Sequence, residues 1–463
     1  MKLNYFNFRK FDNKILMTND FGEYVFISEE EFKRLLKKKI TPNSDLYDRL
    51  IQSNMIYEED GISYSSKSRY KLMDKKNHLI VATSLHIFVV TTACNMNCVY
   101  CQANSGRNST KLYMNKATAE KAVDIALKST AKFLEFEFQG GEPLLNFEII
   151  KHIVEYTEKH KEQHKVHYNI VSNLTLLTDE IINFLQIYNF GISTSLDGSK
   201  EIHDNNRVFI NGKGTYDIVT EKLDVLRQKK LHVGAIETTT KYALSKPIDL
   251  VNEYSTLGFE GIFIRPLTPL GKADNNWNKI GYDADEFINF YRTALEEIIE
   301  INKSGVFFRE EHATIFLRKL FGQFVNYMEL RSPCGAAIGQ LAYYCDGNIF
   351  TCDEGRMLYE MGIDSFKLGN VYENTYEDLI KSKVCKTVCS ASILETIPSC
   401  TDCVYQPYCG VCPVVNYAMN NDLLEKQPRE YRCKIYSGIL DCIFEKLLED
   451  NSETINIFKL WCN

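Results

Sequence analysis

Three cysteines, Cys94, Cys98 and Cys101, stand close together with the spacing C-x3-C-x2-C, and Tyr100 precedes the last of them. Cysteine thiolates are the usual ligands of iron–sulfur clusters. A [4Fe–4S] cluster normally takes four thiolates, one for each iron, so a loop with three leaves one iron open for an exchangeable ligand. The spacing therefore predicts a cluster that can bind a further molecule.

A second motif, Gly140-Gly141-Glu142-Pro143, directly follows a strand-like run. Two glycines let the backbone approach a neighbour closely, and a carboxylate suits an ammonium group. With the cysteine loop, this motif resembles the Gly-Gly-Glu-Pro element of the radical S-adenosylmethionine (radical SAM) enzymes. The resemblance implies that S-adenosylmethionine chelates the open iron, faces Gly140, Gly141, Glu142 and Pro143 with its amino group, and is cleaved to a 5′-deoxyadenosyl radical.

Polar residues also end later strand-like runs, where the resemblance places the rest of the cofactor. Ser172 and Asn173 are expected near its ribose and carboxylate, and Ile264 near its adenine. Ser195 and Arg207 are candidates for the carboxylate end, since an arginine fork suits a carboxylate. These residues form the predicted cofactor site together with the Gly-Gly-Glu-Pro element.

The stretch from Ser195-Leu196-Asp197-Gly198 to His203-Asp204-x-x-Arg207 resembles the branch of the family that modifies peptides and proteins. His203 and Asp204 have an alternative interpretation, in which they cap the loop by local hydrogen bonds. Asp353 matches an aspartate that is implicated as a base in the related sulfatase-maturing enzymes. A carboxylate beside a cluster can act as a base if burial raises its pKa, although Asp353 could instead bind nearby backbone.

A second group of cysteines lies near the C-terminus, with Gly347-x4-Cys352 followed by Cys400-x2-Cys403-x5-Cys409-x2-Cys412. This pattern resembles the SPASM domain, which binds two auxiliary [4Fe–4S] clusters, so three clusters are expected in all. It departs from the family in one place, because two residues rather than three separate Cys409 from Cys412. The resemblance assigns Cys400, Cys403, Cys409 and Cys433 to one cluster. It assigns Cys334, Cys352 and Cys412 to the other, with Cys345 or an open iron at the fourth position.

Zinc is the alternative for this segment, since C-x2-C pairs are typical of zinc ribbons. The chain has 15 cysteines, and in a reducing compartment clustered cysteines are metal ligands more often than disulfides. A cytoplasmic location is expected, because no secretory signal and no apolar run of about 20 residues is visible. The net charge of −7 argues against a nucleic-acid partner.

The elements that must position these residues alternate between strand and helix. Strands are expected at 85–90, 133–138, 167–172, 192–196, 233–238 and 261–266, with helices between them, as at 117–129, 179–188, 216–229 and 247–257. This alternation predicts an α/β fold with a parallel sheet, in the form of a partial (β/α)6 barrel. The cysteine loop follows the first strand, at the edge where such folds place their sites.

Four regions are expected: residues 1–75, a barrel at 84–280, a helical bridge at 281–333, and a cysteine-rich SPASM domain at 334–463. Residues 1–75 combine short strands with a Ser28–Glu31 capping box, a helix at 30–38 and another at 45–54, which fits a small winged-helix-like unit. The polar stretch 58–76 is interpreted as a linker. An amphipathic helix is expected near 437–448.

Peptide maturases often carry such an N-terminal unit, which pairs an edge strand with the leader of a precursor peptide. Short strings of this chain are similar to the maturases of His-Xaa-Ser systems and their cyclophane-forming relatives. The resemblance implies oxidative crosslinking of a ribosomal peptide through a C–C, C–O or thioether bond, with electrons from a flavodoxin or ferredoxin. The alternatives are an anaerobic sulfatase maturase that forms formylglycine and a non-catalytic zinc or Fe–S scaffold.

Overall fold

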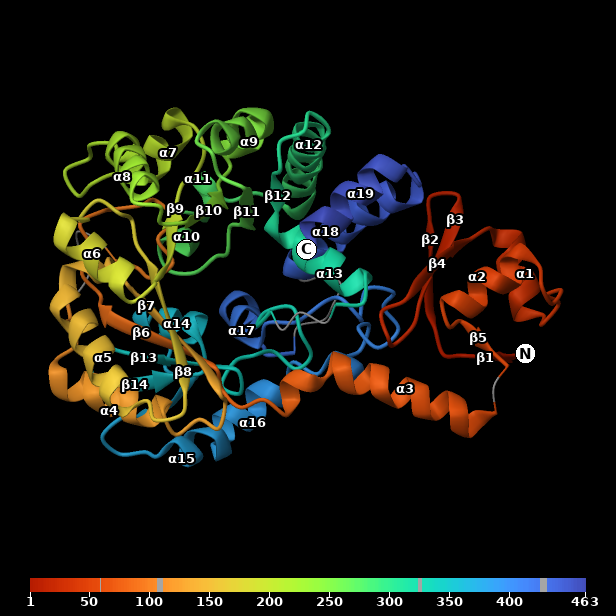
Figure 1. Cartoon of the computed structure of the whole chain (residues 1–463), viewed down its shortest axis with the longest axis horizontal. Helices are drawn as coiled ribbons and strands as arrows, with labels where there is room; N and C mark the ends of the chain where they lie inside the picture. The colour runs from red at the N-terminus through yellow and green to blue at the C-terminus, as the bar shows by residue number, and fades with distance from the viewer. Residues whose placement is uncertain (59, 106–110, 324–326, 425–430) are drawn as a thin grey trace.

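A computed structural model describes the whole chain except residues 59, 106–110, 324–326 and 425–430 (Figure 1). Its described residues form a ten-stranded sheet in the order β12-β11-β10-β9-β8-β7-β6-β13-β14-β15. The six central strands are parallel, as the sequence predicts. These strands are β6 (Leu85–Thr91), β7 (Phe133–Gly140), β8 (Lys165–Val171), β9 (Gly191–Ser195), β10 (Val233–Thr239) and β11 (Gly261–Pro266).

Helices follow these strands and cover the outer face of the sheet, so the α/β fold with a partial barrel is confirmed (Figure 1). Apolar residues alternate along each strand, and one set packs outward against the helices. In β7, for example, Leu134, Phe136 and Phe138 are buried. The helices are α4 (Lys116–Ala126), α5 (Phe147–His160), α6 (Asp179–Ile187), α7 (Lys200–Asn206), α8 (Tyr216–Gln228) and α9 (Pro247–Thr256), with 3-10 turns η2 (Pro143–Asn146) and η3 (Ala243–Ser245).

The segment 281–333, for which a helical bridge is predicted, contains two helices in its described part. Its long helix α12 begins with a capping box between Asp283 and Glu286, and packs on α9 and on the C-terminal helix α18. The elements between β11 and the cysteine-rich segment are α10 (Lys272–Asn275) and α11 (Trp277–Ile280), which precede the bridge, and α12 (Ala284–Lys303), β12 (Arg309–Glu310) and α13 (Glu311–Leu320) within it.

The cysteine-rich segment is joined to the barrel through the sheet itself. Its strand β13 pairs in parallel with β6, with Ala342 opposite Ile87, and β14 and β15 continue the sheet antiparallel. The expected helix at 437–448 is the second half of a longer one, and a final helix was not predicted. The elements are β13 (Gln340–Tyr343), β14 (Asn348–Phe350), α14 (Asp353–Glu360), β15 (Lys367–Asn370), α15 (Tyr376–Lys381), α16 (Lys383–Ser390), η4 (Leu394–Thr396), α17 (Pro413–Asn420), α18 (Tyr431–Leu448) and α19 (Ser452–Trp461).

The N-terminal unit has its own small core, and the capping box between Ser28 and Glu31 forms as predicted. Its three-stranded sheet has the order β2-β3-β4, so β2 and β4 are the edge strands. Its elements are β1 (Lys2–Leu3), β2 (Asn7–Phe11), β3 (Lys14–Thr18), β4 (Tyr24–Ile27), α1 (Glu29–Leu36), α2 (Asp45–Gln52) and β5 (Ile56–Tyr57).

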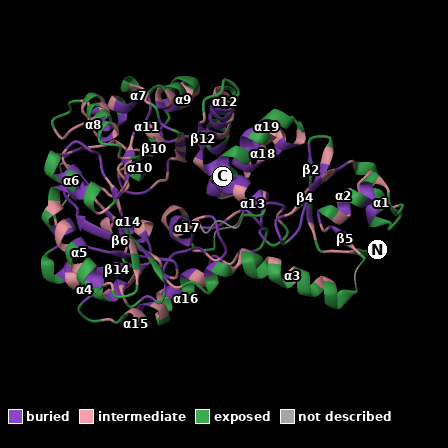
Figure 2. Ribbon diagram, viewed as in Figure 1, coloured by how far each residue is buried: buried purple, intermediate pink, exposed green. Residues whose placement is uncertain are grey.

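The polar stretch 58–76, interpreted from the sequence as a linker, is helical over most of its described residues, which form α3 (Gly61–Lys75) and lead to η1 (Asn77–Leu79). The helix has no buried residue and is largely exposed in Figure 2, which explains why its sequence lacks an apolar stripe. Asp60 caps its first turn by accepting hydrogen bonds from the amides of Ile62 and Ser63. A local cap, rather than packing, marks this helix in the sequence.

The N-terminal unit packs against the cysteine-rich segment rather than standing apart. The Thr18 hydroxyl donates to the carbonyl of Val404 at 2.7 Å, and the Tyr408 hydroxyl donates to the carbonyl of Gly22 at 2.9 Å. Phe444 of α18 contacts the aromatic rings of the unit, namely Phe11, Tyr24 and Phe26. The unit is therefore held by both apolar and polar contacts.

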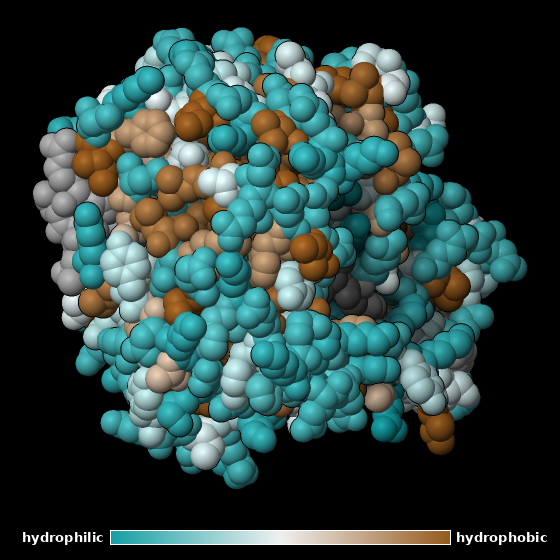
Figure 3. Space-filling model, turned by 60° about the vertical axis from the view of Figure 1, so that its left-hand side comes forward, coloured by the Kyte–Doolittle hydropathy of each residue, from teal (hydrophilic) through white to brown (hydrophobic). Residues whose placement is uncertain are grey.

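The surface shown in Figure 3 is mostly hydrophilic, with apolar side chains gathered in smaller patches. Among the described helices, none has the length and apolar character that crossing a membrane requires.

Candidate functional site

A cavity of about 460 Å³ opens at the carboxyl ends of the barrel strands. One wall consists of the cysteine loop, the ends of β7 to β11, and Leu85 and Ile87 of β6. The opposite wall comes from residues 327–329, Gln340 and the first turns of α14. The barrel and the cysteine-rich segment therefore build one site together.

The cysteine loop places Cys94, Cys98 and Cys101 in the wall of this cavity. Backbone bonds hold the loop: the amides of Asn97 and Val99 donate to the chain near Arg207, and the amide of Lys272 donates to the carbonyl of Cys101 at 2.9 Å. Gly271, at φ +58°, lies so close that a Cβ there would be 2.3 Å from the carbonyl oxygen of Gln102. Sequence reasoning missed this glycine, whose partner is distant in the chain.

The thiols of this loop are close enough to influence one another's ionisation. Burial raises the pKa of Cys98 to about 11, the Arg207 guanidinium opposes this rise, and a Cys101 thiolate would add to it. Burial also raises the pKa of Cys94, with Cys98 contributing. Since iron takes the thiolate form, binding of a cluster here would release protons. Three half-buried thiols from one loop, all lining the same cavity, are a donor set that fits an iron–sulfur cluster.

Gly140 and Gly141 allow the end of β7 to pass directly against the start of the cysteine loop. A Cβ on Gly140 would be 2.1 Å from the carbonyl oxygen of Thr91, and one on Gly141 would be 2.3 Å from that of Ala93. The amides of Gly141 and Glu142 donate to the same two carbonyls, at 2.9 and 2.8 Å. The close approach expected of these glycines is thus made to the loop that carries the thiols.

Glu142 is buried, lines the cavity and binds the end of β8. Its carboxylate accepts hydrogen bonds from the Ser172 hydroxyl and the Asn173 amide, each at 2.8 Å, and caps the short helix begun by Pro143. Burial raises the pKa of Glu142, and these hydrogen bonds oppose that shift. Ser172, Asn173 and Ser195 also line the cavity, as predicted for cofactor contacts.

Arg207 reaches the cavity as part of a buried network that sequence reasoning missed. Its Nη1 donates to the Tyr100 hydroxyl at 2.7 Å, and this hydroxyl donates to the Asp197 carboxylate at 2.7 Å. Its Nε is buried with no partner among the described residues. The network orients the guanidinium beside Cys98 and leaves one donor unpaired, which fits a carboxylate-bearing cofactor.

The alternative interpretation of His203 and Asp204 is confirmed. The Asp204 carboxylate accepts from the amides of Thr215 and Tyr216, at 2.7 and 2.9 Å, at the start of α8. The amide of Asp197 donates to Nδ1 of His203, so Nε2 carries the proton that reaches the Thr215 hydroxyl. Both side chains shape the loop behind the cavity.

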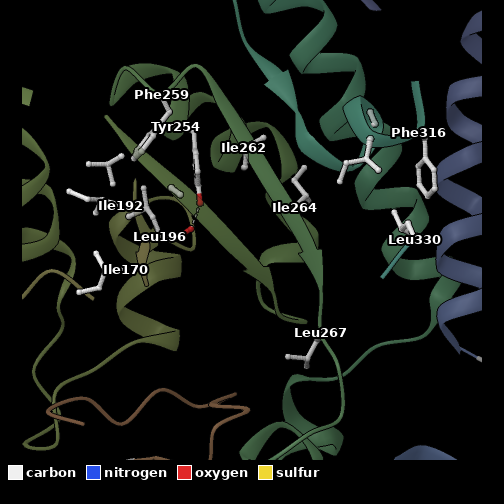
Figure 4. Close-up of a cluster of buried hydrophobic side chains, with 14 of the residues drawn as sticks. Ile170, Ile192, Leu196, Tyr254, Phe259, Ile262, Ile264, Leu267, Phe316 and Leu330 are labelled. Carbon is white, nitrogen blue, oxygen red and sulfur yellow. Dashed lines mark hydrogen bonds between the residues drawn. The ribbon is translucent and has the colours of Figure 1, made fainter. Parts of the chain in front are cut away.

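Ile264 lies in the hydrophobic core and not in the cavity wall (Figure 4). Alternation along β11 turns its neighbours Phe263 and Arg265 toward the cavity instead. The backbone groups of Ile264 are also engaged, with the amide bound by Glu310 and the carbonyl by His312. The predicted contact of this residue with adenine is corrected accordingly.

The structure brings together all four cysteines predicted for one auxiliary cluster. Cys400, Cys403, Cys409 and Cys433 line a cavity of about 290 Å³. Burial raises the pKa of Cys409, and the charges of the other three thiolates would raise it further. Phe8 and Arg9 of β2 line the same cavity, so the N-terminal unit covers part of this site.

The second auxiliary set is brought together only in part. Cys334, Cys352 and Cys412 pack in one apolar cluster and influence one another's ionisation. Cys345 belongs to a different cluster, and its thiol donates to the carbonyl of Val89 at 3.1 Å. The prediction that Cys345 completes this set is therefore corrected: it follows β13, whose pairing with β6 carries it to the barrel side.

Among the residues that the structure describes, no three Cys, His, Asp or Glu side chains converge tightly enough to hold a single metal ion. A zinc ion requires sulfurs about 2.3 Å from its centre, and therefore close to one another.

Asp353 begins α14 and lines the cavity, where Arg356 binds it. The Arg356 Nε donates to the Asp353 carboxylate at 2.8 Å, and its Nη2 donates to the Gln139 amide oxygen at 3.4 Å. Gln139 in turn donates to Glu137 on the same strand. Glu137 and Arg356 were not predicted as site residues, although alternation in β7 places Glu135, Glu137 and Gln139 on the inner face of the barrel.

Comparisons with known proteins agree with this geometry. Residues 88–243 match the family model described as the radical SAM superfamily. A cysteine-type anaerobic sulfatase-maturating enzyme from Clostridium novyi is 24% identical over 337 residues, which are 70% of this chain and 86% of that protein.

Two solved structures share the fold. Native anSMEcpe with bound AdoMet has a TM-score of 0.69 at 21% identity and covers 79% of this chain and 98% of its own. Streptococcus suis SuiB bound to the precursor peptide SuiA has a TM-score of 0.54 at 14% identity and covers 91% of this chain and 98% of its own. The second alignment extends further along this chain than the first.

Proposed function

We propose, from the premise that this chain is a radical SAM enzyme, that it oxidises a ribosomally made peptide and links two of its side chains. The observation that carries the proposal is the shared cavity, whose two walls come from the barrel and from α14. Helix α14 begins directly after Cys352. A substrate in this cavity would lie between the cofactor site and a second group of thiols.

The radical SAM family implies a [4Fe–4S] cluster and S-adenosylmethionine, which when bound supply a radical that removes hydrogen from an unactivated carbon. Cys94, Cys98 and Cys101 would hold that cluster. Glu142 and Arg207 would orient the amino and carboxylate ends of the cofactor, because both residues line the cavity and their charges are opposite to those of the two ends.

We also propose two auxiliary clusters, which would accept the electron that the substrate releases as its new bond forms. Cys400, Cys403, Cys409 and Cys433 would hold one, and Cys334, Cys352 and Cys412 the other. A flavodoxin or ferredoxin would supply reducing electrons. The regions proposed are the N-terminal unit at 1–75, the barrel at 84–280, the bridge at 281–333 and the SPASM domain at 334–463, all in the cytoplasm.

The precursor peptide is proposed to bind through its leader at the N-terminal unit. The likeness to SuiB, which was solved with a precursor peptide, supports this idea and covers 91% of this chain. The three-stranded sheet also offers edge strands to which a peptide strand can be added.

Formylglycine formation on a sulfatase is the second candidate, and the name of the Clostridium novyi relative favours it. The longer coverage by SuiB favours the crosslink, since anSMEcpe covers 79% of this chain and SuiB covers 91%.

Anaerobic co-expression with the peptide encoded beside the gene tests the proposal. Mass spectrometry should show loss of two hydrogen atoms, and fragmentation should find two residues joined. In parallel, a cysteine-containing sulfatase peptide should gain no aldehyde that hydrazine traps. An aldehyde on that peptide, with the neighbouring peptide unchanged, would establish the second candidate instead.

A further inference from the structure

Two carboxylates from different elements line the cavity near each other: Glu137 on β7 and Asp353 on α14. Glu137 lies on the inner face of the barrel, with Ile87 opposite it on β6 and Asn169 opposite it on β8. Ile87 and Leu85 line the same cavity, so the floor beside Glu137 is partly apolar.

A series of hydrogen bonds connects the two carboxylates, and their direct partners differ: Asp353 binds a guanidinium, whereas Glu137 binds a side-chain amide. Arg356 binds the Asp353 carboxylate through Nε at 2.8 Å and the Gln139 oxygen through Nη2 at 3.4 Å. The Gln139 amide nitrogen donates to Glu137. Within this series of four described residues, the one cation is Arg356, which binds Asp353 directly and is 2% exposed.

The two groups therefore differ in their hydrogen-bond partners. The Arg356 guanidinium occupies one oxygen of the Asp353 carboxylate. Glu137 has a neutral amide as its partner, so burial raises its pKa to about 7, with Gln139 opposing this rise and Asp353 adding to it. Paired carboxylates whose environments differ in this way commonly divide acid–base roles.

We propose that Glu137, rather than Asp353, is the base that accepts the proton which the peptide loses as its new bond forms. This inference rests on the proposed function. Asp353 and Arg356 become positioning residues, which hold Gln139 and through it the Glu137 carboxylate.

The proposed step balances as follows. One hydrogen atom leaves a substrate carbon for the 5′-deoxyadenosyl radical. The second reacting group gives its proton to Glu137 while it bonds to the carbon radical, and the surplus electron passes to an auxiliary [4Fe–4S] cluster. The peptide thereby loses two protons and two electrons and gains one bond.

The groups that face Glu137 limit what else could titrate in its place. On its own strand these are Glu135 and Gln139, and from α14 they are Asp353 and Arg356. Its strand partners, Ile87 and Asn169, do not titrate. Glu135 is exposed and accepts a hydrogen bond from Asn169, so it provides a matched control two residues away.

The experiment compares Glu137→Gln, Glu137→Asp, Asp353→Asn and Glu135→Gln in the full-length enzyme with its clusters reconstituted. The probe is the peptide encoded beside the gene, made with deuterated amino acids. Two products are followed: linked peptide, and 5′-deoxyadenosine that contains peptide deuterium. Iron content and thermal unfolding establish that each variant folds.

Glu137→Gln should lower linked peptide by about 10²- to 10⁴-fold, the usual contribution of a general base, while deuterium still reaches 5′-deoxyadenosine. Glu137→Asp should recover part of the product, Asp353→Asn should lower it less than Glu137→Gln, and Glu135→Gln should match wild type. The wild-type rate of linking should rise with pH to a plateau, with a midpoint near the Glu137 pKa of about 7. Glu137→Gln should lack this dependence.

Linked peptide from Glu137→Gln within threefold of wild type would overturn the inference and leave the proposed function standing. Equal loss of linked peptide and of deuterium transfer would also overturn it, since that pattern indicates a structural role. A wild-type enzyme that forms no linked peptide would overturn the proposed function, and the inference with it.

Discussion

Cys94, Cys98 and Cys101 come from one short loop, whereas Cys334, Cys352 and Cys412 come from three separate segments. Local backbone bonds and the glycines of the β7 end shape the first group. The second depends on the sheet, because β13 and β14 separate Cys334 from Cys352, and Cys412 precedes α17. Cys345 shows the consequence: it is close to this group in sequence, yet packs against the barrel. Spacing places Cys345 wrongly because the pairing of β13 with β6, and not distance along the chain, decides which thiols lie together.

Cysteine replacement in the loop should have the largest effect of any change considered. Changing Cys94, Cys98 or Cys101 to alanine should abolish 5′-deoxyadenosine formation from S-adenosylmethionine and dithionite, because one cluster ligand is lost. Cys462→Ala, at a buried cysteine away from the thiol groups, is the control. Normal 5′-deoxyadenosine production by the loop variants would contradict the assignment of these three cysteines as cluster ligands.

The second group can be tested by the pair Cys334→Ala and Cys345→Ala. Three cubanes would hold about twelve iron atoms per chain, and Cys334→Ala should lose about four of them. Cys345→Ala should keep the full content, because its thiol binds the carbonyl of Val89. Iron content is measured chemically and by electron paramagnetic resonance. Loss of iron from Cys345→Ala would support Cys345 as the fourth ligand of the second auxiliary cluster.

Gly141→Ala tests how strictly local packing shapes the loop. A Cβ there would be 2.3 Å from a backbone oxygen, so the β7 end must move away from the cysteine loop. Overpacking of this kind costs about 1–3 kcal/mol, and S-adenosylmethionine should bind more weakly in equilibrium dialysis. Gly61→Ala, where nothing lies within 4 Å, should leave both stability and binding nearly unchanged. Equal behaviour of the two variants would contradict this packing.

The smallest effect is expected at the joint between the barrel and the cysteine-rich segment. The Tyr343 hydroxyl of β13 bonds Nδ1 of His86 on β6 at 3.0 Å, and both are buried. Tyr343→Phe should reduce the free energy of unfolding by about 1–3 kcal/mol, the cost of an unsatisfied buried group. Denaturant unfolding measures this, and Tyr70→Phe at an exposed tyrosine is the comparison.

The same joint predicts a pH dependence. Burial lowers the pKa of His86 to about 3, so below its unfolded value of about 6.5 the unfolded chain binds the extra proton. The contribution of His86 to stability should be complete above that value and should decline as the pH falls toward 3. Replacing His86 with glutamine should flatten this acid limb, and an unchanged slope would assign the limb to other groups.

The sequence predicted six parallel strands almost to the residue, because alternating apolar faces and regular helices report burial directly. It did not predict α3, which has no apolar stripe, or β13, whose partner β6 lies far away in the chain. Within the site, it found Glu142, Ser172, Asn173, Ser195 and Arg207, which line the cavity. It misplaced Ile264, because strand alternation turns its neighbours inward.

By itself, the sequence determined the α/β fold and the cysteine loop, since each is encoded in contiguous residues, and its motifs indicated a radical SAM enzyme by resemblance. Only the tertiary structure decided which distant residues share a cavity. It separated Cys345 from Cys334 and placed β2 beside the cavity of the four cysteines. It also paired Asp353 with the Arg356 guanidinium and Glu137 with the Gln139 amide. The physical reason is that long-range pairing and burial, which select partners and shift pKa values, depend on the packed chain.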